Sequence, residues 1–194
     1  MSESDSKTSK KRDIVVKIAQ NLFFKHGIRR ISVTEICKEA KVSKMTFYRF
    51  FQNKDDLAKH ILDILIDGMM ELIDAIFESK ELSFAEKMEK VTAIKIEALK
   101  ETSNEFFRDL MDDDSEAGRH MLKRRAEALI HIKNIYIDAQ KRGEIRQDVS
   151  VDFILAIIEH FRGFMRDETM QKIYPNHSDL MQQVSNFYLH GILN

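Results

Sequence analysis

Three side chains that follow Ser43 have the chemistry needed to read base pairs in duplex DNA. Lys44 can donate to guanine O6 or N7, and the Thr46 methyl can touch a thymine methyl. Met45 adds a bulky apolar side chain between them. All three would lie in the first turn of a short helix, the part of a recognition helix that meets the major groove. Outside such a motif, Lys44 would be an ordinary solvated charge.

Cap residues predict the elements that would position these side chains. Ser32 with Glu35 three residues later forms a capping box, so a short helix should run from Val33 to Ala40. Ser43 offers a second N-cap directly after a tight turn at Lys41-Val42, and a helix from Lys44 to Phe50 should follow. Two short helices joined in this way are a helix-turn-helix.

The remaining pattern predicts an all-α fold of about nine helices. One Pro and six Gly leave little material for turns, and Leu, Ile, Met, Glu, Lys and Ala favour helices. A polar arm through Lys10-Lys11-Arg12 should precede a first helix that ends at Gly27, and a long helix should begin after Asn53 and run towards Phe77. Later helices are expected over about 84–100, 105–111, 115–142, 151–170 and 178–192.

Charge is divided unevenly along the chain. Residues 1–60 hold 14 Lys and Arg against 7 Asp and Glu, which gives +7, whereas the remainder holds 17 against 25, which gives -8. A basic N-terminal unit can neutralise DNA phosphates, and an acidic remainder would be repelled from the duplex. Chance clustering of charges on solvated faces is the alternative.

Several classes of protein are disfavoured. No apolar run approaches the roughly 20 residues that span a bilayer, and the opening residues are too polar for a signal peptide, so we expect a cytoplasmic protein without membrane contact. The single Cys37 excludes an internal disulfide and a multi-Cys zinc site. The sequence holds no Gly-rich phosphate loop, nucleophile elbow, Glu-x-x-His pair or convincing triad, so we expect no enzyme, no cofactor and no metal.

From Arg12 to Leu62 the sequence resembles the N-terminal domain of the TetR (tetracycline repressor) family of transcriptional regulators. Later segments, Arg142–Arg146 and Phe187–Ile192, resemble the family's dimerisation helices only in layout. Lys41 stands where the family usually has Gly, and Met45 replaces another common Gly. The resemblance rests on residues at the family's spacing: Ile14, Ala19, Leu22-Phe23, Gly27, Ser32-Val33, Ile36, Ala40, Val42-Ser43-Lys44, Thr46, Tyr48, Phe51, Lys54 and Leu57.

The resemblance implies a dimeric repressor that binds double-stranded DNA at a near-palindromic operator. Residues 1–56 would form the DNA-binding domain with a flexible N-terminal arm, and 57–194 a helical ligand-binding and dimerisation domain. Tyr48 and Lys54 match the family's phosphate contacts, although Tyr48 is alternatively a core aromatic and the basic arm a solubilising tail. The expected DNA-binding set is Thr34, Ser43, Lys44, Met45, Thr46, Tyr48, Arg49 and Lys54.

Two apolar stripes near the C-terminus match the helices through which the family dimerises. A two-fold homodimer would hold two recognition helices one DNA turn, about 34–36 Å, apart or a multiple of it. The alternative is that both stripes face the subunit's own core. The expected interface residues are Ile154, Leu155, Ile158, Phe161, Val184, Phe187 and Tyr188.

The resemblance also implies a small, apolar or amphipathic inducer, bound among the middle helices and of unknown identity. Ordinary core packing is the alternative for each lining residue. His131, His160 and the run Asp112 to Asp114 are metal candidates that a solvated surface explains more simply. The alternative function is that of a DNA-binding protein that activates transcription, organises DNA or recruits a partner instead of repressing. The expected pocket residues are Met69, Met70, Met88, Phe106, Phe107, Met111, Met121, His131, Tyr136 and Phe164.

Overall fold

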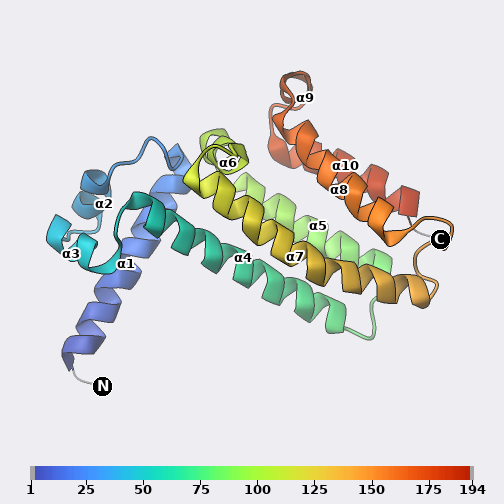
Figure 1. Cartoon of the computed structure of the whole chain (residues 1–194), viewed down its shortest axis with the longest axis horizontal. Coiled ribbons are helices and arrows are strands. Elements are labelled where there is room, and N and C mark those ends of the chain that lie inside the picture. The colour runs from blue at the N-terminus through green and yellow to red at the C-terminus, as the bar shows by residue number, and fades with distance from the viewer. Residues whose placement is uncertain (1–2, 193–194) are drawn as a thin grey trace. The chain divides into compact units, whose positions relative to one another are not determined.

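The computed structural model describes residues 3–192, and within that range it contains ten α-helices and no strand (Figure 1). This confirms the predicted all-α class. No helix in the described range is long and apolar enough to cross a membrane. The helices are α1 Glu3–His26, α2 Val33–Glu39, α3 Lys44–Phe50, α4 Lys54–Glu78, α5 Phe84–Lys100, α6 Asn104–Met111, α7 Glu116–Lys141, α8 Val151–Arg166, α9 Glu168–Ile173 and α10 His177–Ile192.

Serine caps determine where half of these helices begin. In each case the serine hydroxyl accepts a hydrogen bond from the backbone N–H three residues later, which satisfies one of the N–H groups that a helix start leaves unpaired. Ser32 and Ser83 also form complete capping boxes with Glu35 and Glu86, and the first of these is the box predicted above. The five caps are Ser32, Ser43, Ser83, Ser103 and Ser150.

The N-terminal segment differs from the prediction of a polar arm. Helix α1 already includes Lys10, Lys11 and Arg12, because nothing between residues 3 and 26 is Gly or Pro. Arg12 is also anchored: its guanidinium lies 5.1 Å from the centre of the Phe51 ring and 3.0 Å from His60 Nε2. Burial, and then the Arg12 charge, lower the pKa of His60. Arg12 therefore contributes to the fold.

The tenth helix arises where the sequence predicts a single helix over 151–170. Helix α8 ends at Arg166, and Asp167 has extended backbone angles (φ -70°, ψ 122°). The Asp167 carboxylate accepts from the Met170 N–H at 2.9 Å and so caps the short helix α9. A side chain that favours a cap over a helix interior thus divides the predicted element in two.

The chain divides into two compact units that do not follow the predicted boundary after residue 56. Unit 1 comprises Met1–Ile66 and Thr102–Leu122, and unit 2 comprises Asp67–Glu101 and Lys123–Asn194. Helix α6 returns to unit 1 because its apolar side chains, Phe106 among them, join the core around the helix-turn-helix. Phe24 and Phe106 meet with their ring centres 4.9 Å apart.

Unit 2 has its own core, in which α10 packs against α5 and α8 (Figure 1). Phe84 and Tyr136 meet edge to face with their ring centres 5.5 Å apart. The Tyr136 hydroxyl donates to the Met88 sulfur at 3.6 Å, and burial raises the pKa of Tyr136 to about 12. Tyr188 is also buried, and burial and the neighbouring Tyr136 raise its pKa.

Candidate nucleic-acid interface

The turn between α2 and α3 is closed by a strained residue. Lys41 has a positive φ of 52°, the left-handed conformation that glycine adopts more easily. Its N–H donates to the Lys38 carbonyl at 3.2 Å, and the Val42 N–H donates to the Cys37 carbonyl at 3.0 Å. Two such bonds satisfy the last carbonyls of α2 in a Schellman motif. The sequence prediction of a tight turn at Lys41-Val42 is therefore confirmed, with a non-glycine residue at its strained position.

Helix α3 has one buried side and one exposed side. Phe47 is fully buried and Phe51, just after the helix, is 3% exposed, so both fix the helix against the unit 1 core. On the other side Met45 is 83% exposed and Tyr48 is 55% exposed. Lys44 is exposed as well. The leading edge of α3 is therefore open to a partner.

The remaining predicted contact residues differ in how free their side chains are. Thr34 is exposed at the start of α2. The Thr46 hydroxyl lies 3.0 Å from the Ser43 hydroxyl and Thr46 is half-buried, so its polar atom already serves the helix cap. Tyr48 is exposed and packs edge to face against Phe47 at a ring-centre distance of 5.4 Å. Arg49 is exposed and its guanidinium lies 5.2 Å from the centre of the Phe50 ring.

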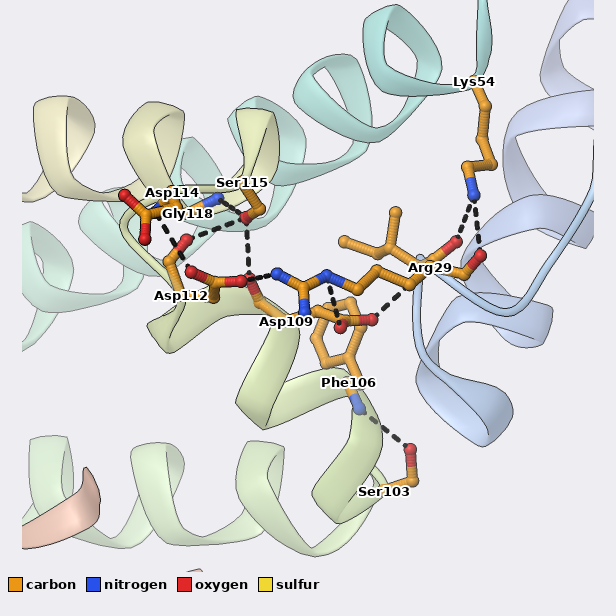
Figure 2. A network of polar contacts seen from close by, with 10 residues as sticks. Arg29, Lys54, Ser103, Phe106, Asp109, Asp112, Asp114, Ser115 and Gly118 are labelled. Atoms are coloured by element: carbon orange, nitrogen blue, oxygen red, sulfur yellow. Dashed lines mark hydrogen bonds and ion pairs between the residues drawn. The ribbon is translucent and has the colours of Figure 1, made fainter. Parts of the chain in front are cut away.

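Lys54 makes contacts within the chain (Figure 2). Its ammonium donates to the carbonyls of Ile28 at 2.7 Å and Arg29 at 3.0 Å. These bonds tie the start of α4 to the loop between α1 and α2, and they occupy two of the three ammonium donors. In the free chain Lys54 therefore positions that loop, and at most one donor is left for a phosphate.

The same loop is held from the other side by α6 (Figure 2). The buried Asp109 carboxylate accepts from the Arg29 backbone N–H at 3.0 Å and lies 3.5 Å from Arg29 Nε. The Arg29 guanidinium also pairs with Asp112. Gly27 has a φ of 82°, and a Cβ there would lie 2.8 Å from the Asp109 carboxylate. Gly27 thus permits both the turn and the close approach of Asp109.

The acidic run at the end of α6 is a loop held by its own backbone bonds. The Asp114 N–H donates to the Asp112 carboxylate at 3.0 Å, and Ser115 donates to the Asp112 carbonyl. A Cβ on Gly118 would lie 1.9 Å from that carbonyl, so only glycine fits there. Within residues 3–192 no group of three or more His, Cys, Asp or Glu side chains is placed to hold a metal ion.

The helix-turn-helix matches known proteins in sequence. Residues 15–61 match the family model described as bacterial regulatory proteins, tetR family. The helix-turn-helix region belongs to this family. HTH-type transcriptional regulators of Staphylococcus aureus strains USA300 and NCTC 8325 are 34% identical over 74 residues. The match covers 36% of this chain and spans 39% of the length of those relatives.

Several solved structures share the fold of nearly the whole chain, including the TetR-type region, residues 15–61. Regulatory protein TetR from Rhodobacter sphaeroides matches with a TM-score of 0.73 at 16% sequence identity. The match covers 93% of this chain and 98% of that protein's chain. Fatty acid degradation regulator FadR from Bacillus halodurans has a TM-score of 0.71 at 18% identity, with coverages of 93% and 95%. The SmeT–triclosan complex has a TM-score of 0.73 at 16% identity, with coverages of 95% and 92%.

The residues predicted for a single ligand pocket lie in different units. Phe106, Phe107, Met111 and Met121 belong to unit 1, where Phe106 and Met111 are part of the core that supports the TetR-type region. A cavity of about 90 Å³ between α5 and α10 is lined by none of the predicted residues. The predicted residues in unit 2 are Met69, Met70, Met88, His131, Tyr136 and Phe164. The cavity is lined by Glu89, Thr92, Ala93, Gln182, Asn186 and Leu189.

Two residues predicted for the dimer interface lie in the subunit core instead. Ile154 is 1% exposed and Tyr188 is 8% exposed, because both side chains face the interior of unit 2. Phe187 is 75% exposed, and Phe153, which the prediction omitted, is 58% exposed. The apolar stripes are thus wide enough to fill the core and to present aromatic rings outward. Leu155, Ile158, Phe161 and Val184 are half-buried.

Two polar residues outside the TetR-type region, Asp109 and Lys95, were not predicted from the sequence. Asp109 is buried beside an exposed arginine, and no sequence pattern links positions eighty residues apart. Lys95 did leave a signal. It follows Phe84, Met88 and Val91 at helical spacing, so it falls in the apolar stripe of α5, where a lysine is unexpected.

Proposed function

We propose that this chain is a transcriptional repressor that binds operator DNA as a homodimer and is released by a small amphipathic molecule. The observation that carries the proposal is the two-sided α3, with Phe47 buried in the core and Lys44, Met45 and Tyr48 facing outward. A helix presented in this way, at the end of a helix-turn-helix, is suited to the major groove.

Charge and geometry support DNA as the partner. The net charge of +7 over residues 1–60, which includes the exposed Arg49 on α3 itself, favours phosphates. Tyr48 is placed to reach a phosphate with its hydroxyl while its ring stays on Phe47. We assign base reading to Lys44, Met45 and Thr46.

Exposed aromatic rings on α8 and α10 support a homodimer. Phe153 and Phe187 are each more than half exposed, and Phe164 is 40% exposed. Rings of this size are usually covered, because burying them removes a large apolar area from water. A second copy of the chain would cover them and would present two α3 helices to a near-palindrome.

The proposed ligand response depends on unit 2. The solved SmeT structure is a triclosan complex, and FadR is described as a regulator of fatty acid degradation. Those descriptions concern those proteins. In this chain, Met69, Met70 and Met88 are half-buried and can adapt to an apolar guest.

Selection from a pool of randomised duplexes tests DNA binding and dimerisation together. We expect the purified full chain to enrich a near-palindrome whose half-sites lie about one or two helical turns apart. Failure to enrich any sequence at low salt, from protein shown to be folded, would refute the proposal. A single enriched half-site with a monomeric complex would refute the dimer.

Variants of α3 test the assignment of residues. Lys44→Ala and Met45→Gly should change the selected sequence, with each good base contact worth about 1–3 kcal/mol of discrimination. Tyr48→Phe should weaken all duplexes alike, because a phosphate contact carries no sequence information. Lys90→Ala, an exposed lysine on α5, is the control for loss of one positive charge. Unchanged selectivity in both base-reading variants would show that another edge of α3 faces the bases.

Transcription in vitro separates repression from the other regulatory roles. A template with the selected site across a promoter should yield less transcript when the protein is added. More transcript would indicate an activator. No change, together with binding at many scattered sites, would indicate a DNA-organising or partner-recruiting protein.

A further inference from the structure

Met45 exposes an apolar side chain that the fold does not use. It is 83% exposed, more than Phe187 at 75% or Ile130 at 71%, and it is not among the described side chains that form or flank the unit 1 core. The next residue, Thr46, is half-buried, and its hydroxyl lies 3.0 Å from that of Ser43. A long side chain left in water adds nothing to stability, because it removes no apolar area from water. Met45 is therefore available to a partner.

The face of α3 that carries Met45 points away from the core. Tyr48 and Arg49 follow Met45 by three and four residues, so the three side chains lie on one side of the helix. Phe47 lies on the opposite side and is fully buried. Tyr48 is 55% exposed, and Arg49 is exposed as well. A partner that meets this face therefore meets Met45 together with a cation and a phenol.

Charge restricts what that partner can be. The exposed Lys44 precedes Met45, and Arg49 follows it one turn later, so cations flank the methionine on both sides. The complementary surface is anionic and holds an apolar group between its charges. The major groove of duplex DNA has this pattern, because phosphates line both of its edges and the base edges between them present nitrogen and oxygen atoms and the C5 methyl group of thymine.

We propose that Met45 reads the C5 methyl group of a thymine and so makes the chain selective for an A·T pair at one position of each half-site. The inference rests on the DNA binding proposed above and names the chemical group that this residue recognises. The unbranched thioether is flexible and adapts its end to the methyl group. Burying one methyl group corresponds to a gain of about four-fold in affinity for each half-site.

Replacement of single thymines by deoxyuridine tests the methyl group. Deoxyuridine keeps every hydrogen-bonding atom of thymidine and lacks only the C5 methyl. The probe is the duplex that the full chain enriches, and fluorescence anisotropy gives its affinity. We expect one thymine position in each half-site at which loss of the methyl group weakens binding about four-fold. An enriched half-site without thymine, or a loss below about two-fold at every thymine, would overturn the proposal.

Met45→Ala tests the residue, with Met45→Leu as the conservative variant. Met45→Ala should bind the thymine and uracil duplexes with equal affinity, whereas Met45→Leu keeps an apolar side chain and should still prefer thymine. Lys90→Ala, at an exposed position of α5, should keep the wild-type preference. Met45 is exposed, so its variants should fold, which urea unfolding checks. A preference for thymine that persists in Met45→Ala would overturn the proposal and assign the methyl contact to Thr46.

Cytosine provides an independent check at the same position. Where cytosine paired with guanine replaces that thymine, a 5-methyl group on the cytosine should raise the affinity of the wild type about four-fold and leave that of Met45→Ala unchanged. A methyl group that weakens wild-type binding would show that Met45 leaves no room for it, and would overturn the proposal. Failure to bind any duplex would refute the proposed function and this inference with it. Selective binding that is insensitive to the methyl group would refute this inference alone.

Discussion

The two compact units treat their buried polar groups in different ways. In unit 1 the buried Asp109 carboxylate is bonded to Arg29, and the Lys54 ammonium is bonded to two carbonyls of the same loop. In the described part of unit 2, Lys95 has no hydrogen bond or ion pair. The buried Tyr188 hydroxyl also has no hydrogen-bond partner there, although the neighbouring Tyr136 contributes to its raised pKa. Among the described residues, these polar groups of unit 1 are paired, whereas the Lys95 ammonium and the Tyr188 hydroxyl of unit 2 are not.

This difference fits the two tasks proposed above, DNA recognition and a ligand response. A helix that reads base pairs must keep its geometry, and satisfied polar bonds around a packed core keep α3 in place. An unpaired amine in an apolar stripe weakens a fold, because burying a charge without a partner is unfavourable. Four substitutions test this contrast.

The largest effect is expected for Phe47→Ala in the unit 1 core. Phe47 is fully buried and holds α3 against the core. The substitution should therefore lower the free energy of unfolding by about 3–5 kcal/mol, because apolar burial is lost and a cavity remains. Urea unfolding followed by circular dichroism measures it, and duplex binding should be lost with it. A cost below about 1 kcal/mol would mean that α3 does not depend on this anchor.

Asp109→Asn should lower the free energy of unfolding by about 1.5–3 kcal/mol. The neutral amide lacks the negative charge that pairs with the Arg29 backbone N–H and guanidinium. The control is Glu105→Gln on the same helix, whose exposed pair with Arg108 should contribute under about 0.5 kcal/mol. Urea unfolding of both variants gives the comparison. Equal costs would show that the buried carboxylate adds nothing beyond a surface pair.

Lys95→Met should have the opposite sign and stabilise the chain by about 1 kcal/mol, because it replaces an unpaired, partly buried charge with an apolar side chain. The pH dependence gives a further check. The pKa of Lys95 is lowered in the folded chain, so below its ordinary value of 10.5 the unfolded chain binds more protons, and the free energy of unfolding should rise with pH. This rise should be absent in Lys95→Met.

Tyrosines limit the pH range in which that comparison is clean. The pKa of Tyr136 is raised to about 12, so above pH 10 the unfolded chain loses its proton first and stability should fall. Burial also raises the pKa of Cys37 from its ordinary value of 9.0, which lowers stability within the same range. The difference between the urea midpoints of the wild type and Lys95→Met, from about pH 7 to about pH 9.5, therefore isolates the lysine. A wild-type midpoint that falls relative to that of Lys95→Met over this range would contradict the expected sign.

The smallest effect is expected for Lys41→Gly. Relief of the left-handed strain is worth about 1 kcal/mol, but glycine also gains freedom in the unfolded chain, so the net gain should be about 0.5 kcal/mol. Lys38→Gly, at an exposed helical position of α2, should instead destabilise by about 0.5–1 kcal/mol. A loss of stability in Lys41→Gly would show that the Schellman turn is not strained.

Local signals in the sequence determined most of the helix-turn-helix. The capping serines, the turn at Lys41 and the apolar spacing of Phe47 and Phe51 each act over a few residues, so the helices and the exposed edge of α3 follow from the sequence alone. The match of residues 15–61 to a known family agrees with them.

The packing of the folded chain fixes which distant groups meet. It placed α6 with unit 1, brought Asp109 to Arg29, used Lys54 to hold a loop, and turned Ile154 and Tyr188 into the subunit core. It also left Lys95 without a hydrogen bond or ion pair in the described residues. Helical periodicity gives each side chain a face, but the packing of whole helices determines what that face meets, because contacts between distant positions leave no local pattern in the sequence.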